Sequence, residues 1–199
     1  AILVVYEREG PLRVVNVQGR VVSRLEVPWP GFRQLDPLAA QMIATDARSG
    51  GLFAVAFRVG NGFFLFRDSL PLPYYGVFVE HTDFPTVTRS SSGGTHTARV
   101  SPSPESALSL VLREDHLYVH FAGTTKNRYA LMDIYEVATG HYVRTLVLPR
   151  RVVRVAVDER GVVYGIVEEP YPGLYAWRTE QMSAPGPSLE EPTNERTES

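Results

Sequence analysis

Two hairpin-like stretches near opposite ends of the chain constrain its fold most strongly. One is DIYEVATGHYVRTLVLP, residues Asp133–Pro149, and the other is LRVVNVQGRVVSRLEVP, residues Leu12–Pro28. In each, apolar runs flank a glycine, Gly140 or Gly19, and a proline follows that glycine nine residues later. Because proline cannot donate to a strand ladder, each stretch predicts a β-hairpin whose second strand ends at the proline. The chain therefore repeats a structural unit.

A second element recurs between these hairpins. In VAVDERGVVYGIV, residues Val155–Val167, a turn with Asp and Gly joins an aliphatic strand to an aliphatic–aromatic strand. The same order occurs in LVLREDHLYVHF, residues Leu110–Phe121, and in IATDARSGGLFAVAF, residues Ile43–Phe57. Arg113 and Asp158 occupy the same place in their turns and lie 45 residues apart, which is within the range of propeller blades.

Short apolar runs joined by brief turns fill most of the remaining chain. They are rich in β-branched and aromatic residues, and no helical pattern of about 10–15 residues separates them, which argues against strand–helix–strand units. A single helical turn is expected where Asp36 caps LDPLAAQM. The predicted strands are residues 1–7, 12–17, 18–28, 40–45, 52–59, 62–68, 74–81, 109–112, 117–123, 129–137, 142–149, 152–158, 162–169 and 173–179.

The two elements combine into one unit of four strands: an inner strand, a polar turn, two further strands, a glycine turn, and a fourth strand that ends at a proline. Four antiparallel strands repeated at roughly 45 residues are the blade of a β-propeller. The stretch MDIYEVATGHYVRTLVLPRRVVRVAVDERGVVYGIVEE resembles the blades of bacterial six-bladed β-propeller proteins of the NHL-like group. The resemblance extends over Leu108–Trp177 and Ala1–Pro28 and is weak over Trp29–Val100.

The resemblance implies an all-β fold, a β-propeller built of four-stranded antiparallel blades, of which this chain covers about three to four. We count two whole blades, the trailing strands of one at the N-terminus and the leading strands of one at the C-terminus. A closed six-bladed ring needs more chain, so we expect residues 1–180 to form a partial or truncated propeller, the C-terminal part of a larger ring. An open or irregular β-sheet assembly is the alternative. Residues 181–199 have almost no apolar content and are expected to be a disordered tail.

The two longest connections are Trp29–Met42 and Arg89–Thr97. The second lies in TRSSSGGTHT, residues Thr88–Thr97, which reads as a polar Ser- and Gly-rich loop or insertion. Loops on a rigid stack of blades can vary without cost to the core, so we expect the binding surface at these two connections.

The densest group of potential metal ligands is EHTD, which contains Glu80, His81 and Asp83. If the strand continues through them, Glu80 lies on one face and the other two lie on the opposite face. A hard-ion or zinc site would need further ligands from another blade, and no spacing identifies them. The competing interpretation is a strand that simply enters a loop before Pro85.

Other polar residues favour structural roles. His116 and His120 lie four residues apart, about 13 Å along a strand, which is too far to share a metal. Asp46 and Asp158 open turns, where aspartate commonly caps its own backbone. The segment PRRVVR places Arg150, Arg151 and Arg154 at a blade junction; an anionic ligand could bind there, but on a chain with a net charge of −2 a solvated edge is favoured.

Composition excludes several classes of function. The chain has no cysteine, so it has no disulfide or thiolate site, and its net charge of −2 gives no electrostatic footprint for nucleic acid. No apolar run reaches the roughly 18 residues that span a membrane, and no Gly-rich stretch has the context of a phosphate-binding loop. No cofactor is expected.

We therefore predict a non-catalytic β-propeller module that binds an unknown protein or small-molecule ligand through its blade loops. The resemblance admits an alternative, a propeller hydrolase or lyase with a metal in the central channel. Glu80, His81 and Asp83 are the only local group of candidate ligands for such a metal. A third possibility is a fragment without independent function. The resemblance also implies an extracytoplasmic location, periplasmic or secreted.

Overall fold

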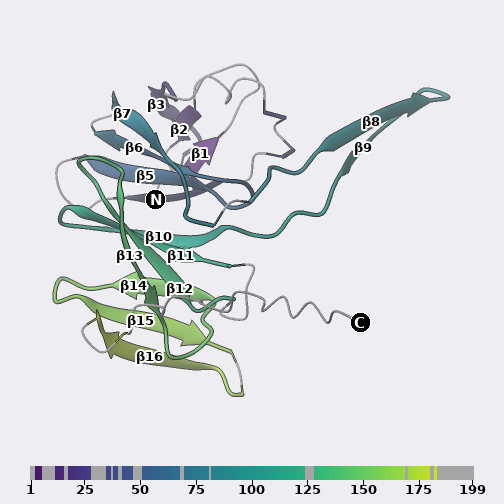
Figure 1. Ribbon diagram of the computed structural model, residues 1–199. Helices are drawn as coiled ribbons and strands as arrows, with labels where there is room; N and C mark the ends of the chain where they lie inside the picture. The colour runs from purple at the N-terminus through teal and green to yellow at the C-terminus, as the bar shows by residue number, and fades with distance from the viewer. Residues whose placement is uncertain are drawn as a thin grey trace, which may run out of the picture.

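The structure is a computed structural model that describes residues 3–5, 12–15, 18–27, 35–36, 38–39, 42–46, 51–67, 70–80, 82–123, 128–168, 170–179 and 182. These residues form 16 β-strands in antiparallel sheets, with no α-helix among them (Figure 1). Within the same residues, no helix has the length and apolar character required to cross a membrane.

The sheet that contains the predicted Asp133–Pro149 hairpin is a complete four-stranded blade. Its strands follow chain order: β10 (Ala107–Arg113), β11 (His116–Phe121), β12 (Leu131–Glu136) and β13 (Tyr142–Val147). Gly140, with φ 71°, makes the turn between the last two strands, and the chain leaves the sheet before Pro149. The order predicted from the repeat is therefore confirmed.

The other sheets confirm the predicted count of two whole blades with a partial one at each end. The second complete blade consists of β4 (Met42–Asp46), β5 (Leu52–Phe57), β6 (Phe63–Arg67) and β7 (Leu70–Gly76). Among the described residues, each partial blade has three strands: β1 (Leu3–Val5), β2 (Leu12–Val15) and β3 (Val21–Leu25), and then β14 (Arg154–Val157), β15 (Val162–Val167) and β16 (Gly173–Arg178).

The first strands of successive blades lie next to one another. β10 packs beside β4 on one side and beside β14 on the other, and β1 contacts β4. In Figure 1 the β4–β7, β10–β13 and β14–β16 sheets accordingly follow one another from top to bottom. Among the described strands, no hydrogen-bonded ladder joins β1–β3 to β14–β16. The sheets are thus arranged as propeller blades.

The core consists of layers between adjacent blades. Alternation along β12 sends Leu131 and Tyr135 into the layer shared with β4–β7, where the Tyr135 ring lies 4.8 Å from that of Phe63. Met132 and Ile134 enter the layer shared with β14–β16. Because both faces of this blade are buried, its central strands are mostly apolar, with His120 and Asp133 as buried polar exceptions.

The polar segment Thr88–Thr97, predicted as an irregular loop, is instead part of a regular β-hairpin. β8 (Val87–Ser92) pairs with β9 (Thr95–Val100) around the turn Gly93–Gly94, and the hairpin projects from the upper right of Figure 1. Both glycines have positive φ, 58° and 81°, as two-residue hairpin turns require. Both faces of the hairpin are in water, so its sequence lacks the alternation by which a half-buried strand is recognised.

The strand predicted at residues 74–81 also differs from the structure, in which β7 begins at Leu70 and ends at Gly76. Its two prolines, Pro71 and Pro73, are tolerated because β7 is the outer strand of its sheet and pairs on one side only. After β7 the chain leaves the sheet, and the Phe78 backbone N–H donates to the Asn61 side chain at 3.0 Å.

Two predictions concern connections and the tail. Asp36 caps a single turn as expected, since its Oδ1 accepts from the Leu38 N–H at 2.9 Å and its carbonyl accepts from the Ala39 N–H at 2.8 Å. Met182 alone is described from the predicted tail, and it is buried against the β14–β16 layer. The rest of residues 181–199 lies outside the described residues, as does Trp29 with the start of its connection.

Candidate functional site

A pocket of about 570 Å³ opens at the end of the blades where β10 and β14 begin. Its lining comes mainly from the connections between strands. These supply Arg58 after β5, Glu105 before β10, Tyr129 before β12, Arg150–Arg154 before β14, and Glu168 after β15. We call this site the arginine pocket, because four of its lining residues are arginines: Arg58, Arg150, Arg151 and Arg154.

Backbone hydrogen bonds between blades hold these connections in place. The Ser106 N–H donates to the Arg58 carbonyl at 2.6 Å, which places Glu105 beside the end of β5. The Val152 N–H donates to the Tyr129 carbonyl and the Val153 N–H donates to the Ile166 carbonyl, both at 2.9 Å. The pocket wall is therefore built on strand ends of three sheets and is preorganised.

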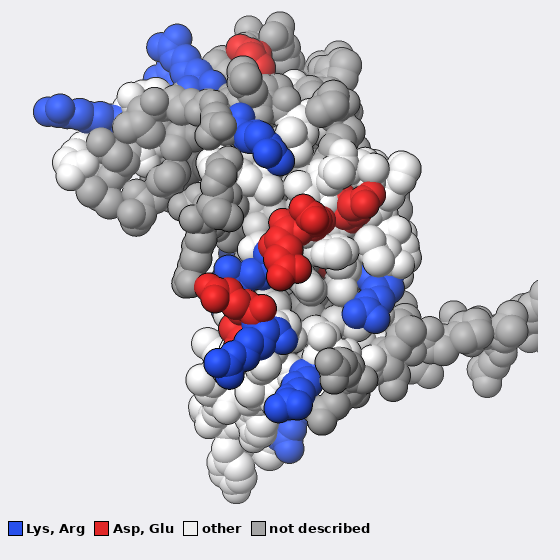
Figure 2. Space-filling view, turned by 90° about the vertical axis from the view of Figure 1, so that its left-hand side faces the viewer, with Lys and Arg blue, Asp and Glu red and all other residues white. Residues whose placement is uncertain are grey.

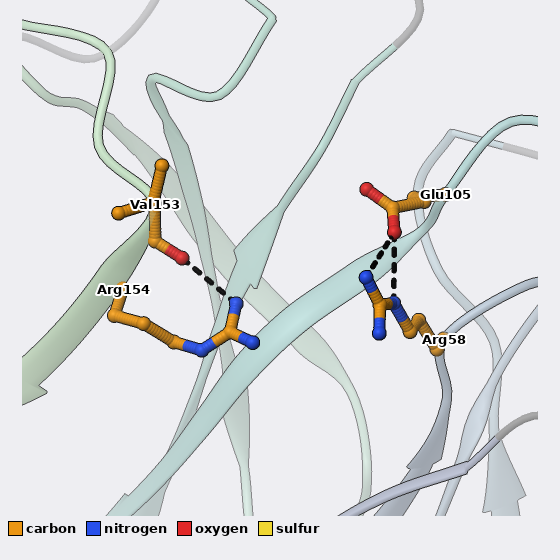
Figure 3. Close-up of polar contacts among 4 residues, drawn as sticks. All are labelled: Arg58, Glu105, Val153 and Arg154. Atoms are coloured by element: carbon orange, nitrogen blue, oxygen red, sulfur yellow. Dashed lines mark hydrogen bonds and ion pairs between the residues drawn. The ribbon is translucent and has the colours of Figure 1, made fainter. Parts of the chain in front are cut away.

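Two of the arginines lie on either side of β10. Arg58 binds Oε1 of Glu105 through Nε at 2.8 Å and through Nη2 at 2.5 Å. Arg154 donates from Nη1 to the Val153 carbonyl at 2.9 Å, and in Figure 3 its guanidinium points across the strand toward the Arg58–Glu105 pair. Glu105 compensates the charge of Arg58, whereas Arg154 has only a neutral carbonyl as its hydrogen-bond partner among the described residues.

The remaining arginines of the connection differ in how firmly they are held. The Arg150 guanidinium lies 4.7 Å from the centre of the Tyr175 ring and contacts its hydroxyl at 3.4 Å. Tyr175 in turn stacks on Trp177, with ring centroids 6.0 Å apart. Arg151 is exposed and makes no hydrogen bond or ion pair with the part of the chain that the structure describes. It is the most readily available cation of the pocket.

A buried histidine lies behind the pocket wall. His120 Nε2 donates to the carbonyl of Tyr129 at 3.3 Å, while Ser109 Oγ is 3.5 Å from Nδ1 and accepts from the Val155 N–H. Burial, with a smaller contribution from the positive charge of Arg154, lowers the pKa of His120 to about 4. The ring is therefore neutral at pH 7 and is not part of the pocket lining, and Ser109 connects it to Val155 of the next blade.

The predicted metal ligands are only partly described. Glu80 is half-buried near Gly123 and Asp133, and its charge contributes to the raised pKa of Asp133. Asp83 is exposed, and its backbone carbonyl accepts from Ser103 Oγ at 2.8 Å. His81 lies outside the described residues. No group of three His, Asp or Glu side chains among those described is placed to hold a metal ion.

Asp133 is a buried carboxyl group that the sequence interpretation treated only as part of a hairpin. It is 4% exposed in the layer between β4–β7 and β10–β13, and Thr145 Oγ1 donates to its Oδ1 at 2.5 Å. Burial is the main cause that raises the pKa of Asp133 to about 6. Its place in the mostly apolar strand β12, LMDIYE, is the only sequence signal of this environment.

The opposite end of the blades carries the turns and has a mixed charge. Asp158 caps its own turn as predicted, accepting from the N–H groups of Arg160 at 2.8 Å and Val162 at 2.9 Å, and these bonds lower the pKa of Asp158. His116 lies at this end of β11 and His120 at the pocket end. Figure 2 looks at the left-hand side of Figure 1, where these turns lie, and shows acidic and basic side chains interspersed.

The arginine pocket was only partly visible in the sequence. Arg150, Arg151 and Arg154 were identified at a blade junction, and the interpretation favoured a solvated edge; the structure leaves them exposed and places all three in the pocket wall. Arg58, Glu105 and Glu168 were missed. No local motif could have found these residues, because they come from connections far apart in the sequence.

Comparison with known proteins supports the fold. No protein-family model matches the chain, and no curated protein matches it. A crystal structure of the β-propeller BBS1N in complex with ARL6DN, soaked with lead, is similar with a TM-score of 0.50 and 13% identity over 91% of this chain and 47% of that chain. A second crystal structure of this complex, soaked with mercury, gives a TM-score of 0.48 at 15% identity, covering 89% of this chain and 47% of that chain. The computationally designed Ika8 protein gives 0.41 at 12% identity, covering 92% and 57%.

This chain spans about half the length of the BBS1N chain that it resembles. At 13% identity the likeness shows the fold alone. Together with the sheet order and the neighbouring inner strands, it identifies the chain as an all-β protein with the β-propeller fold.

Proposed function

We propose that the protein is a non-catalytic β-propeller module that binds a ligand in the arginine pocket. One observation carries this proposal: connections from three sheets converge on a single pocket of about 570 Å³. Sites for small molecules are typically concave and about 300–1,000 Å³ in volume, with apolar walls and a few polar groups that orient the ligand. Leu108 and Val152 supply apolar wall here, and the arginines supply the polar groups.

The fold favours the same location. The pocket lies where the connections between successive blades meet, and such connections can vary without disturbing the packed layers below. The backbone bonds that fix Tyr129 and Val152 also make the wall rigid before any ligand arrives. A preformed site loses less conformational entropy on binding than a mobile one.

Ligand-observed and protein-observed NMR with a fragment library of anionic, neutral and cationic compounds tests the proposal. We expect fragments to shift the backbone amides of Val152 and Val153 at millimolar concentration. The variant Val153→Trp should block these shifts, because its indole would occupy part of the pocket. Val143→Trp, at an exposed position on β13, is the matched control and should leave them unchanged.

The two variants distinguish pocket binding from general surface binding. If fragments of every class left the Val152 and Val153 amides unperturbed, or if Val153→Trp and Val143→Trp behaved alike, the proposal would be refuted. Both variants should first be shown to melt within a few degrees of the wild type, so that loss of binding is not loss of folding.

The β8–β9 hairpin supports a second candidate function, recognition of a protein partner. Every residue of β9 and all but Val87 of β8 are exposed, and each of the two strands has one edge that pairs with no other described strand. Arg89 is paired with Asp36 near the base of the hairpin, which ties it to the body. An edge of this kind can accept a strand from another protein by backbone hydrogen bonding.

A photo-crosslinking residue at Ser91, on the hairpin, tests this second candidate in an extract of the source cells. The crosslinker at Ser91 should give a discrete crosslinked product with one partner protein. The same crosslinker at Glu159, in the turn between β14 and β15, should not give this product. Equal products at both positions would contradict a partner site on the hairpin.

Finer predictions from the sequence remain proposals of their own. We propose a likeness to the bacterial NHL-like group and an extracytoplasmic location, both on the resemblance of the blade repeats. We also keep Glu80, His81 and Asp83 as proposed metal ligands. The metal content of the purified protein, compared with that of Glu80→Gln and Asp83→Asn variants, tests this site and with it the alternative hydrolase or lyase function.

A further inference from the structure

We propose that the arginine pocket selects a small dianion, such as a dicarboxylate or a phosphate monoester. This inference rests on the proposed function and names the chemical class of its ligand. The observation behind it is a charge imbalance: four arginines and two glutamates line a pocket on a chain whose net charge is −2.

An excess of positive charge remains in the pocket after the Arg58–Glu105 ion pair is taken into account. Arg58 and Glu105 neutralise each other through two hydrogen bonds to the same carboxylate oxygen. This leaves Arg150, Arg151 and Arg154 facing Glu168, which forms no ion pair with any described residue. Two positive charges of the pocket are therefore uncompensated among the described lining, which matches a ligand of charge −2.

The positions of the cations favour a compact ligand. Three arginines come from one five-residue segment, Arg150–Arg154, and Arg154 is directed across β10 while Arg150 is held against Tyr175. Arginine presents a planar fork of N–H donors that matches a carboxylate or phosphate, and these charge-assisted bonds are the strongest that a side chain offers. The volume of about 570 Å³ admits a small molecule.

The positive charge of Arg154 also affects the neighbouring His120. Burial is the main cause of the lowered pKa of His120, which lies behind the wall, and the charge of Arg154 adds a smaller contribution. Since His120 is held neutral, it does not add charge to the pocket and does not compete for the anion. The arginine side chains are therefore the groups that determine which charge the pocket accepts.

Calorimetric titration of the full chain at pH 7 and low salt tests the inference. The probes are succinate, inorganic phosphate and succinamide, the last being a neutral compound of nearly the same shape as succinate. We expect at least one dianion to bind and succinamide not to bind. Preference for succinate would indicate two separated carboxylates, and preference for phosphate would indicate one tetrahedral group.

Variants of the pocket arginines test whether the dianion binds in the arginine pocket. Arg151→Gln and Arg154→Gln should each weaken the dianion about tenfold or more, because each removes a charge-assisted hydrogen bond. Arg154→Lys should retain part of the affinity. Arg178→Gln, at an exposed position on the opposite end of β16, is the control and should bind as the wild type does.

Three results would overturn the inference: succinamide binding as tightly as succinate, no dianion binding, or equal losses in Arg151→Gln and Arg178→Gln. If fragments still shift the Val152 and Val153 amides in such a case, the pocket binds a ligand of another charge and the proposed function stands. If those amides also fail to respond, both proposals fall.

Discussion

Two buried titratable groups should give the protein opposing dependences of stability on pH. Asp133 lies between β4–β7 and β10–β13, and burial raises its pKa from 3.8 to about 6. His120 lies between β10–β13 and β14–β16, and burial lowers its pKa from 6.5 to about 4. Folding therefore strengthens proton binding at Asp133 and weakens it at His120.

The signs of the two contributions follow from linkage. The contribution of Asp133 to the free energy of unfolding is stabilising and fully present below its unfolded-state pKa of 3.8. It is lost as the pH rises through the folded-state pKa of about 6. The contribution of His120 is present above its unfolded pKa of 6.5 and is lost as pH falls toward about 4. Each shift of about two units corresponds to about 3 kcal/mol in the free energy of unfolding. From pH 7 to pH 4 the two contributions nearly cancel in the wild type.

Replacing one of these two residues should make the pH dependence of stability caused by the other measurable. In Asp133→Asn the His120 contribution is no longer opposed, so from pH 7 to pH 4 the variant should lose about 3 kcal/mol more stability than the wild type loses. In His120→Gln the Asp133 contribution is unopposed, so the variant should gain about 3 kcal/mol relative to the wild type over the same range.

Urea unfolding followed by tryptophan fluorescence at pH 4, 5, 6 and 7 measures these differences. Trp177 lies in β16 and reports on the last blade, and Glu159→Gln at an exposed turn is the control that should follow the wild-type curve. Curves for Asp133→Asn and His120→Gln that both stay parallel to the wild type would refute the assignment of these groups as oppositely shifted, buried residues.

Three further predictions concern packing and turns. Gly76→Ala places a methyl group where Phe63 lies, 2.1 Å from its ring, and should lower the free energy of unfolding by about 1–3 kcal/mol in urea titration, whereas an unchanged midpoint would contradict this packing. Thr145→Val removes the donor to Asp133 and should cost about 1–3 kcal/mol at pH 7, whereas Thr145→Ser should restore most of it. Shortening the hairpin by deleting Ser90–Thr97 should leave the melting temperature within a few degrees, because these side chains bury nothing; a large drop in calorimetry would show that the hairpin supports the core.

The blade pattern could be predicted because its signals are local. Gly140 adopts φ 71° and Gly161 adopts φ 72°, conformations that glycine reaches without strain, so both turns are visible in the sequence. Asp158 caps its turn with its own side chain, which involves only the next four residues. The hairpin β8–β9 was missed for the converse reason: it buries neither face, so its residues carry no periodic apolar signal.

The sequence by itself determined most of the strands, the glycine turns and the four-stranded blade, since each depends on residues close together in the chain. Only the tertiary structure decided the environments of Asp133 and His120, because burial depends on which blade covers a strand. The arginine pocket also required the tertiary structure. Net charge is a sum over the whole chain, whereas a bound ligand interacts mainly with the few charges close to it. The packing of β4, β10 and β14 brings Arg58, Glu105 and Arg154 into one pocket.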